Sequence, residues 1–227
     1  MENTNERTGA NSSTLSSFKG NIYLVGMMGA GKTSVGRLLA KRARKSFFDS
    51  DQVIEERTGV SIPTIFHHEG ESGFRAREQA AIADLTKLDD IVLATGGGAI
   101  LFEENRRSLG ATGFVVYLKA QVNDLWKRTQ ADKNRPLLDT ENPLSKLEDL
   151  FRVRDPIYTA LADLVIETGD PNLQMLLSRL EDELVKARVE EIKINEEQTN
   201  YCEGWEPILS NYYRSRPFSL RGHSRRR

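Results

Sequence analysis

Residues Gly26 to Thr33 form a short glycine-rich run that ends in lysine and threonine, with the spacing G-x-x-x-x-G-K-[ST]. Glycines allow successive backbone N–H groups to curve around a phosphate without a Cβ atom in the way. Lys32 would reach the β- and γ-phosphates, and the hydroxyl of Thr33 could ligate Mg²⁺. An apolar strand pattern precedes the run and an amphipathic helical pattern follows it, which is the context a phosphate loop requires. The run therefore predicts binding of a nucleoside triphosphate but does not specify a reaction.

Two carboxylates, Asp49 and Asp51, follow the second predicted strand. In an open parallel sheet, this end of a strand faces the ligand crevice. One carboxylate can therefore face a metal ion while the other faces a substrate hydroxyl. A helix N-cap is the competing explanation, because Asp51 precedes an amphipathic segment, although capping accounts for one aspartate rather than two. Taken alone, the pair leaves both explanations open.

Three consecutive glycines, Gly96 to Gly98, follow the third predicted strand. Ordered glycines are entropically costly, so the run indicates either close approach of the backbone to a ligand or a flexible turn. On the preceding helical stretch, Glu78 lies three residues after Arg75, a spacing at which a carboxylate can orient a guanidinium. Taken alone, that pair is more typical of an ordinary surface salt bridge.

Two further arginines lie where they could meet an anionic ligand. The polar stretch 131–142 carries Arg135 and has no apolar periodicity, so we expect it to form a lid that closes over the ligands. Arg154 lies at the end of a later helical stretch, directly before Asp155.

The elements that position these residues alternate between short β-branched runs and helical stretches. We predict five strands, at 22–25, 47–49, 91–94, 114–118 and 164–166, separated by helices. The helical patterns cover residues 35–43, 52–58, 61–68, 71–85, 102–109, 122–130, 144–162 and a leucine stripe at 173–184, opened by Asp170-Pro171. Gly59, Gly70 and Gly110 are expected to end helices, and Pro156 to interrupt one locally. This alternation predicts an α/β fold, a three-layer sandwich with a parallel five-stranded sheet.

Composition excludes several classes of protein. Apolar residues make up 38% of the 227 residues, too many for a wholly disordered chain, yet no run approaches the ~18 apolar residues of a membrane helix. The single cysteine, Cys202, cannot form an internal disulfide, which fits a reducing compartment, and we expect a cytoplasmic protein. The three histidines have no metal-ligand spacing, and we interpret the adjacent pair His67-His68 as surface residues.

Charge and composition divide the chain into a body and two appendages. Residues 1–17 are polar without a secretory apolar stretch, and we expect a disordered tail. Residues 18–180 carry equal numbers of acids and bases, so a nucleic-acid-binding body is not indicated. The net charge is −4 over 181–200 and +4 over 201–227. We therefore predict a domain at 18–185 and a mobile C-terminal extension at 186–227.

These motifs, in this order, resemble those of the shikimate kinases of bacteria. The resemblance covers residues 19–182 and rests on six segments: Gly-Met-Met-Gly-Ala-Gly-Lys-Thr, Phe-Phe-Asp-Ser-Asp, Gly-Glu-x-x-Phe-Arg, Thr-Gly-Gly-Gly-Ala, Arg-Pro-Leu-Leu and Arg-Asp-Pro-Ile-Tyr. It implies a P-loop kinase fold with a lid and strand order 2-3-1-4-5. It also implies ATP-dependent phosphorylation of the 3-hydroxyl of shikimate, with one Mg²⁺ per subunit, by a monomer that binds neither membrane nor nucleic acid.

The resemblance also implies roles for individual residues. Asp51 would bind the shikimate hydroxyls, and perform catalysis together with Lys32 and Arg135. The substrate carboxylate would be held by Arg75 and Arg154, with a backbone contact from Gly97. Thr33 would ligate the metal, and Asp49 would support it through water. The ATP-binding residues would be Gly29, Ala30, Gly31, Lys32, Thr33, Ser34, Arg128 and Arg135, of which Arg128 matches the position against the adenine.

Three alternatives remain at this stage. A gluconate-type kinase would share the phosphate loop but should lack the paired arginines Arg75 and Arg154. A non-catalytic ATP-binding regulator would not need Lys32, Thr33, Asp51 and Arg135 together. A bifunctional protein could use the arginine-rich extension, whose six arginines lie among aromatic residues, to bind RNA or an acidic partner. The third strand ends in Ala94-Thr95 without a Walker-B acid, a feature that shikimate kinases share.

Overall fold

The computed structural model describes the chain except for residues 1–14, 16–17, 132–135, 170–171 and 188–227. The chain divides into two units, Met1–Val185 and Lys186–Arg227. The elements reported below belong to the first unit, apart from the last turn of a helix over residues 173–187. Arg135, the predicted helix start at Asp170-Pro171 and nearly all of both predicted appendages lie outside the described residues.

A five-stranded sheet forms the centre of the first unit, and all of its strand pairs are parallel. Its order is β2-β3-β1-β4-β5, so the predicted fold and strand order are confirmed. The strands are β1 (Asn21–Val25), β2 (Ser46–Asp49), β3 (Ile91–Ala94), β4 (Gly113–Lys119) and β5 (Leu164–Glu167). The central strands β1 and β3 are buried along their whole length, as apolar β-branched runs in a sheet covered on both faces should be.

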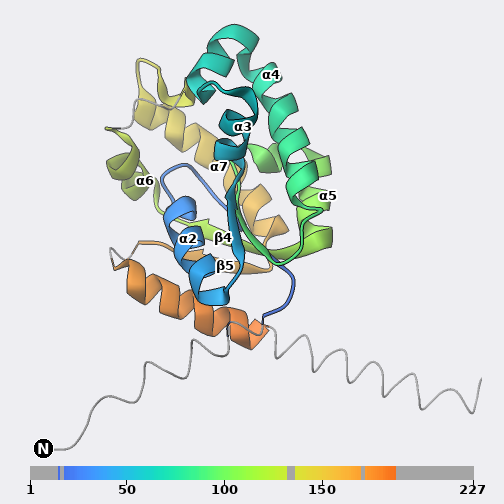
Figure 1. The fold of residues 1–227 in the computed structure, drawn as a ribbon. Helices are drawn as coiled ribbons and strands as arrows, with labels where there is room; N and C mark the ends of the chain where they lie inside the picture. Colours follow the sequence, from blue (N-terminus) through green and yellow to red (C-terminus); the bar gives the residue numbers. More distant parts are fainter. Residues whose placement is uncertain (1–14, 16–17, 132–135, 170–171, 188–227) are drawn as a thin grey trace, which may run out of the picture. The chain divides into compact units, whose positions relative to one another are not determined.

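Helices cover both faces of the sheet (Figure 1). They are α2 (Lys32–Ala43), α3 (Ser50–Thr58), α4 (Ile62–Leu85), α5 (Glu103–Thr112), α6 (Val122–Thr129) and α7 (Pro143–Leu161), with short 3₁₀ turns at Ala99–Leu101 and Pro136–Leu138. Arg42 on α2 binds Glu181, which joins α2 to the helix over residues 173–187. The predicted leucine stripe of that helix is confirmed, because Leu176, Leu177, Leu180 and Leu184 are buried.

The register of the sheet brings three loops to one edge. Leu24 of β1 pairs with Ala94 of β3, and Ala94 also pairs with Asp49 of β2. The chain therefore leaves these three strands at the same level. The segments that follow them are the phosphate loop, the start of α3 and the glycine run, so the topology alone gathers the predicted chemical residues at one place.

Helix α4 contains the break that the sequence predicts at Gly70. That residue has φ 68° and ψ −175°, a conformation outside the helical region that glycine adopts without a Cβ penalty. The chain is helical on both sides, so the predicted pair of helices forms one element with a break. Gly59 likewise ends α3 in a left-handed conformation, as predicted.

Two expectations about local structure are wrong, those for Gly110 and Leu15. Gly110 does not end its helix, because α5 continues to Thr112 and ends where Gly113 becomes extended as the first residue of β4. The helix predicted over 144–162 is found as α7, with Pro156 inside it, where the proline removes one N–H donor. Leu15, placed in the N-terminal tail, is buried in the core, although its polar neighbours show no apolar period.

Among the described residues, no helix is both long enough and apolar enough to cross a membrane.

Candidate active site

The phosphate loop joins β1 to α2 and presents its lysine from the first residue of the helix. Gly31, the N-cap of α2, has φ 93°, which a residue with a Cβ rarely adopts. The ammonium group of Lys32 donates hydrogen bonds to the carbonyl oxygens of Gly26 and Met27, at 2.8 and 2.9 Å. This positive charge therefore lies over the loop at the N-terminal end of a helix, where an anion is favoured.

Thr33 and Asp49 form the oxygen pair that the sequence predicts for a metal. The Thr33 hydroxyl donates to Oδ2 of Asp49 at 2.7 Å. The second oxygen of Asp49 accepts the backbone N–H of Asp51 at 3.0 Å and so caps α3. The N-cap is thus Asp49, whereas the sequence had placed the competing cap at Asp51. The capping role therefore explains part of the position of Asp49. Asp51 lies in the first turn of α3 and lines two cavities.

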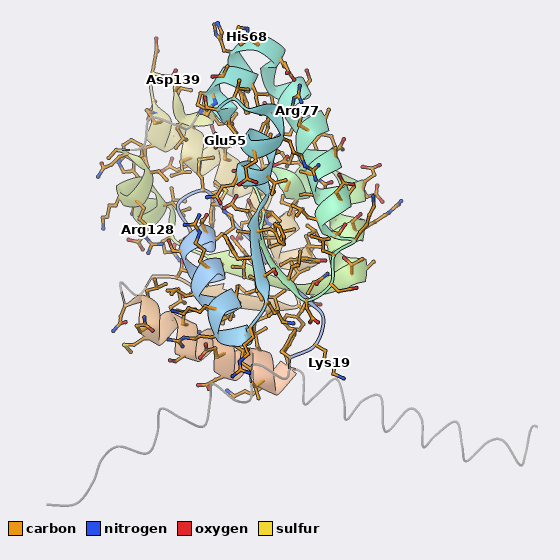
Figure 2. The ribbon with its side chains drawn as sticks, viewed as in Figure 1. Lys19, Glu55, His68, Arg77, Arg128 and Asp139 are labelled. Carbon is orange, nitrogen blue, oxygen red and sulfur yellow. The ribbon has the colours of Figure 1, made fainter. Side chains whose placement is uncertain are left out.

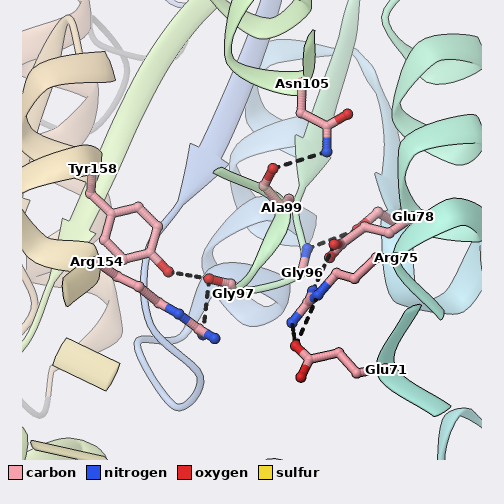
Figure 3. Close-up of polar contacts among 10 residues, drawn as sticks. Glu71, Arg75, Glu78, Gly96, Gly97, Ala99, Asn105, Arg154 and Tyr158 are labelled. Carbon is pink, nitrogen blue, oxygen red and sulfur yellow. Dashed lines mark hydrogen bonds and ion pairs between the residues drawn. The ribbon is translucent and has the colours of Figure 1, made fainter. Parts of the chain in front are cut away.

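A buried ion pair lies beside the glycine run. Arg75 donates from Nη1 to Oε2 of Glu78 at 2.7 Å, so the predicted contact three residues apart is confirmed. The surface setting expected for an isolated pair is wrong, because Glu78 is fully buried and Arg75 is 6% exposed. On its other side, Arg75 donates from Nε and Nη2 to Oε1 of the half-exposed Glu71 (Figure 3).

Burial and ion pairing act against each other on these charges. Burial raises the pKa of the Glu78 carboxyl group, although the neighbouring Arg75 opposes the shift. Burial also works against the charge of Arg75, but Glu78 and Glu71 outweigh it and raise the pKa of that guanidinium. Arg75 therefore keeps its positive charge in a place with little water, where an anionic ligand would interact strongly with it.

Arg154 reaches the same place from α7. Its Nη1 donates to the carbonyl oxygen of Gly97 at 3.2 Å, and the hydroxyl of Tyr158 donates to that same oxygen (Figure 3). Burial lowers the pKa of Arg154, and Arg75 adds a smaller repulsive contribution. Two buried arginines thus approach the glycine run from α4 and α7.

Two glycines of the run, Gly96 and Gly98, leave no room for a side chain. A Cβ atom on Gly98 would lie 2.2–2.4 Å from the guanidinium of Arg75, and one on Gly96 would lie 2.5 Å from Glu78. The run is also fixed by hydrogen bonds, because the N–H of Gly96 donates to the Ser50 hydroxyl and Asn105 donates to the carbonyl of Ala99. Of the two explanations left open by the sequence, the flexible turn is therefore the wrong one. The close packing seen here is against Arg75 and Glu78, and close approach to a ligand stays a prediction.

Two cavities meet at this edge of the sheet. One follows the phosphate loop and is lined by Met28, Gly29, Gly31, Lys32, Thr33, Ser34, Asp49, Asp51, Gln52, Glu55, Thr95 and Gly97. The other is lined by Met28, Asp51, Ile62, Phe66, Phe74, Arg75, Glu78, Gly96, Gly97, Gly98, Pro136, Leu137 and Arg154. Met28, Asp51 and Gly97 belong to both, so they form a shared wall. Asp51 is the carboxylate at this junction.

A third cavity lies on the far side of the phosphate loop. It is lined by Ala30, Gly31, Ser34, Val35, Asp124, Lys127, Arg128, Thr168, Gly169, Leu173 and Leu176. Arg128, in the last turn of α6, donates to the carbonyl oxygens of Gly29 and Thr168 and lies on the surface (Figure 2). Its guanidinium is therefore held next to the phosphate loop, and the predicted contact with the adenine stays a prediction.

Other predicted features lie elsewhere. His67 and His68 are exposed, so their interpretation as surface residues is confirmed. His68 lies at the outer end of the unit (Figure 2). In the described part of the chain, no cluster of three or more metal-ligating side chains is found.

Of the predicted lid, Pro136 and Leu137 line the cavity of the arginines, whereas Arg135 lies outside the described residues.

Two contacts of the site were missed by the sequence interpretation, namely those of Glu71 and Tyr158. Each contact can be recognised in the sequence once the structure is known. Glu71 precedes Arg75 by four residues and Tyr158 follows Arg154 by four, so each shares a helix face with an arginine.

Comparison with known proteins agrees with this geometry. The family model for shikimate kinase matches residues 28–192. A shikimate kinase from Chromobacterium violaceum is 57% identical over 166 residues, which cover 73% of this chain and 90% of that protein.

Solved structures of shikimate kinases are also similar to this chain. The shikimate kinase from Acinetobacter baumannii, solved in complex with shikimate, is 47% identical with a TM-score of 0.74, and the match covers 77% of this chain and 97% of that one. A gluconokinase from Sinorhizobium meliloti has a TM-score of 0.52 at 17% identity, with 78% and 97% of the two chains covered, and shows a common fold only.

Proposed function

The chain belongs to the shikimate kinase family, and from this membership we propose that it transfers the γ-phosphoryl group of ATP to the 3-hydroxyl of shikimate. The products are shikimate 3-phosphate and ADP, in the biosynthesis of chorismate and the aromatic amino acids. The observation that carries this assignment is the pair of buried arginines, Arg75 and Arg154, in a cavity that adjoins the phosphate loop. A small carboxylated polyol needs cations at one end and a hydroxyl acceptor at the other.

The substrate lies with its carboxylate on the two arginines and its hydroxyls toward Asp51. The position of Asp51 at the junction of the two cavities supports this orientation, because the attacking hydroxyl must face the phosphates. Asp51 accepts a hydrogen bond from that hydroxyl and takes its proton as the hydroxyl oxygen bonds to the γ-phosphorus. The bond from that phosphorus to the oxygen bridging it to the β-phosphate breaks, and ADP leaves. Gly97 contributes a backbone contact from the shared wall.

The nucleotide lies along the phosphate loop. Residues Gly29 to Ser34 hold the phosphates through backbone N–H groups, and Lys32 exchanges the carbonyls of Gly26 and Met27 for phosphate oxygens. Arg128 lies against the adenine in the third cavity, and Arg135 approaches the phosphates with the lid. Phosphoryl transfer needs positioning and charge stabilisation more than covalent help from the protein, and this set of residues supplies both.

A magnesium ion fits beside Thr33 and Asp49. These residues already form an oxygen pair at 2.7 Å next to the phosphate cavity. Mg²⁺ prefers oxygen ligands and is commonly held by one or two protein groups together with substrate phosphates. Thr33 would ligate the ion directly and Asp49 through water, and the ion would neutralise charge on the β- and γ-phosphates.

The compartment, oligomeric state and partners of the enzyme are inferred from its sequence. The single cysteine supports a cytoplasmic enzyme, and the neutral body supports one that does not bind nucleic acid. From the resemblance to the family we infer a monomer that does not bind membranes. We infer that the domain spans residues 18–185 and that 1–17 and 186–227 flank it, with Leu15 of the N-terminal segment packed into the core of the domain.

A coupled assay of ADP release tests the reaction. With ATP and Mg²⁺, we expect rapid ADP release when shikimate is added and only slow release without it, because the closed cavity limits hydrolysis. EDTA should stop the reaction and excess Mg²⁺ should restore it. Gluconate in place of shikimate should give no stimulation. Equal rates with and without shikimate would contradict the proposed function, and stimulation by gluconate alone would reassign the substrate.

Removal of residues 187–227 should leave both the turnover and the melting temperature nearly unchanged. The last buried leucine of the 173–187 helix is Leu184, so the core of the first unit keeps its leucine stripe. Differential scanning fluorimetry and the ADP assay on the full and truncated chains measure the effect. A melting temperature lower by several degrees, or aggregation of the truncated chain, would show that the extension is structural.

A further inference from the structure

Tyr158 is buried in the site but has no part in the roles assigned above. Its side chain is fully buried, and its hydroxyl donates to the carbonyl oxygen of Gly97. Arg154, one helical turn earlier on the same face of α7, donates to the same oxygen at 3.2 Å. Both acceptor positions of this carbonyl are therefore used by α7.

The peptide that carries this carbonyl lies between the two arginines. Arg154 contacts Gly97 on the side of α7, while Gly98 packs so closely against Arg75 that a Cβ atom would overlap its guanidinium (Figure 3). The described chain contains no cis peptide, so the N–H of Gly98 points opposite to the Gly97 carbonyl, away from α7. The orientation of one peptide plane thus sets where Arg154 lies relative to Arg75.

Two buried guanidinium groups repel each other, so their separation must be held by other groups. Glu78 and Glu71 hold Arg75 by ion pairs. Arg154 has no ion pair among the described residues; it donates to the Gly97 carbonyl and also interacts with the Tyr158 hydroxyl. Whatever fixes the Gly97 carbonyl therefore also fixes Arg154.

We propose that Tyr158 is a positioning residue for the substrate carboxylate: its hydroxyl holds the Gly97 carbonyl in the orientation that seats Arg154 beside Arg75. This inference rests on the proposed function, because it assumes that the two arginines bind the carboxylate of shikimate. Tyr158 itself touches neither substrate in this arrangement and acts through the peptide and the arginine.

The ring of Tyr158 is held independently of its hydroxyl. It stacks on Tyr117 with ring centroids 4.8 Å apart and an interplanar angle of 27°. The Tyr117 hydroxyl donates to Asp155 at 2.8 Å and does not reach the glycine run. Tyr158→Phe therefore removes one hydroxyl and leaves the stacked ring in place, and Tyr117→Phe is a matched control in the same stack.

The test compares the kinetics of these two variants. We expect Tyr158→Phe to raise KM for shikimate about fivefold, since a single intramolecular hydrogen bond is lost, with KM for ATP changed less than about twofold. Tyr117→Phe should leave both KM values nearly unchanged. A loss of folded protein would lower the apparent kcat but not KM, so the readout remains valid if Tyr158→Phe is less stable. An unchanged KM for shikimate would overturn the proposal.

Two further measurements separate positioning from a general structural role. In an Arg154→Ala background, Tyr158→Phe should add almost nothing to KM for shikimate, because the group through which it acts is gone. An analogue of shikimate with a carboxamide in place of the carboxylate should lose the difference between wild type and Tyr158→Phe. Two results would overturn the inference. One is that Tyr158→Phe and Arg154→Ala raise KM for shikimate additively, and the other is that Tyr158→Phe raises KM for the carboxamide analogue as much as KM for shikimate. If wild type itself does not respond to shikimate, the proposed function fails instead.

Discussion

Lys32→Ala should reduce shikimate-dependent ADP release by about 1000-fold while the protein stays folded. Removing one preorganised group that stabilises transition-state charge typically costs 100- to 1000-fold in kcat, and this lysine is the loop's own cation. Its ammonium group donates to two carbonyl oxygens of the loop, those of Gly26 and Met27. Alanine is also a good first residue for α2, so the melting temperature should change little.

Lys41→Ala is the matched control for this variant. Lys41 lies in the last turn of the same helix and is exposed, so its removal deletes an equal charge far from the loop. Its turnover should equal that of the wild type. Turnover of Lys32→Ala within a few-fold of wild type would show that the loop does not bind the transferred phosphoryl group.

Arg154→Ala should raise KM for shikimate by at least about 30-fold and change KM for ATP far less. Loss of a charged hydrogen-bond partner in a closed site costs ~2–5 kcal/mol, although part of the loss can appear in kcat. Arg152→Ala is the control, because Arg152 lies two residues away on α7 with its side chain 78% exposed. Equal changes of the two KM values would mean that Arg154 does not bind the carboxylate.

Arg75→Ala should raise KM for shikimate as well, but it should also destabilise the protein. Glu78 is fully buried, and removal of its partner would leave a carboxylate without its ion pair, which typically costs ~3–5 kcal/mol if the group stays charged. Adding Glu78→Gln should restore part of the melting temperature but not the affinity for shikimate. This separation of two effects distinguishes Arg75 from Arg154, which has no such ion pair in the described part of the chain.

The architecture was predictable because the sequence signals were local and periodic. Apolar strand runs, the phosphate-loop spacing and the glycine at position 70 each dictate a conformation within a few residues. The wrong predictions concern features that tertiary packing determines, namely where a helix ends and whether an isolated apolar residue is buried. Gly110 can continue a helix as well as end one, and only the start of β4 at Gly113 determines the end of α5. Leu15 is buried, but its polar neighbours in the sequence form no apolar period that would predict its burial.

The site was predictable as a set of residues but not as an arrangement. Helical spacing predicted the contact of Arg75 with Glu78, whereas its burial depends on Gly98, which comes from a different element. The bond from Tyr158 to Gly97 spans 61 residues of sequence and ends on a backbone atom. No spacing rule identifies a backbone partner at that distance, so this contact required the structure.

The wall shared by the two cavities is a place where the two ligands could be coupled thermodynamically. Met28, Asp51 and Gly97 each face both the phosphate loop and the arginine pair. If one ligand changes the position or charge of this wall, the affinity for the other changes by some factor. By linkage, the second ligand then changes the affinity for the first by the same factor, whichever binds earlier. An inhibitor built for the carboxylate pocket would accordingly vary in affinity with the nucleotide present, and its strength would depend on the cell's ratio of ATP to ADP.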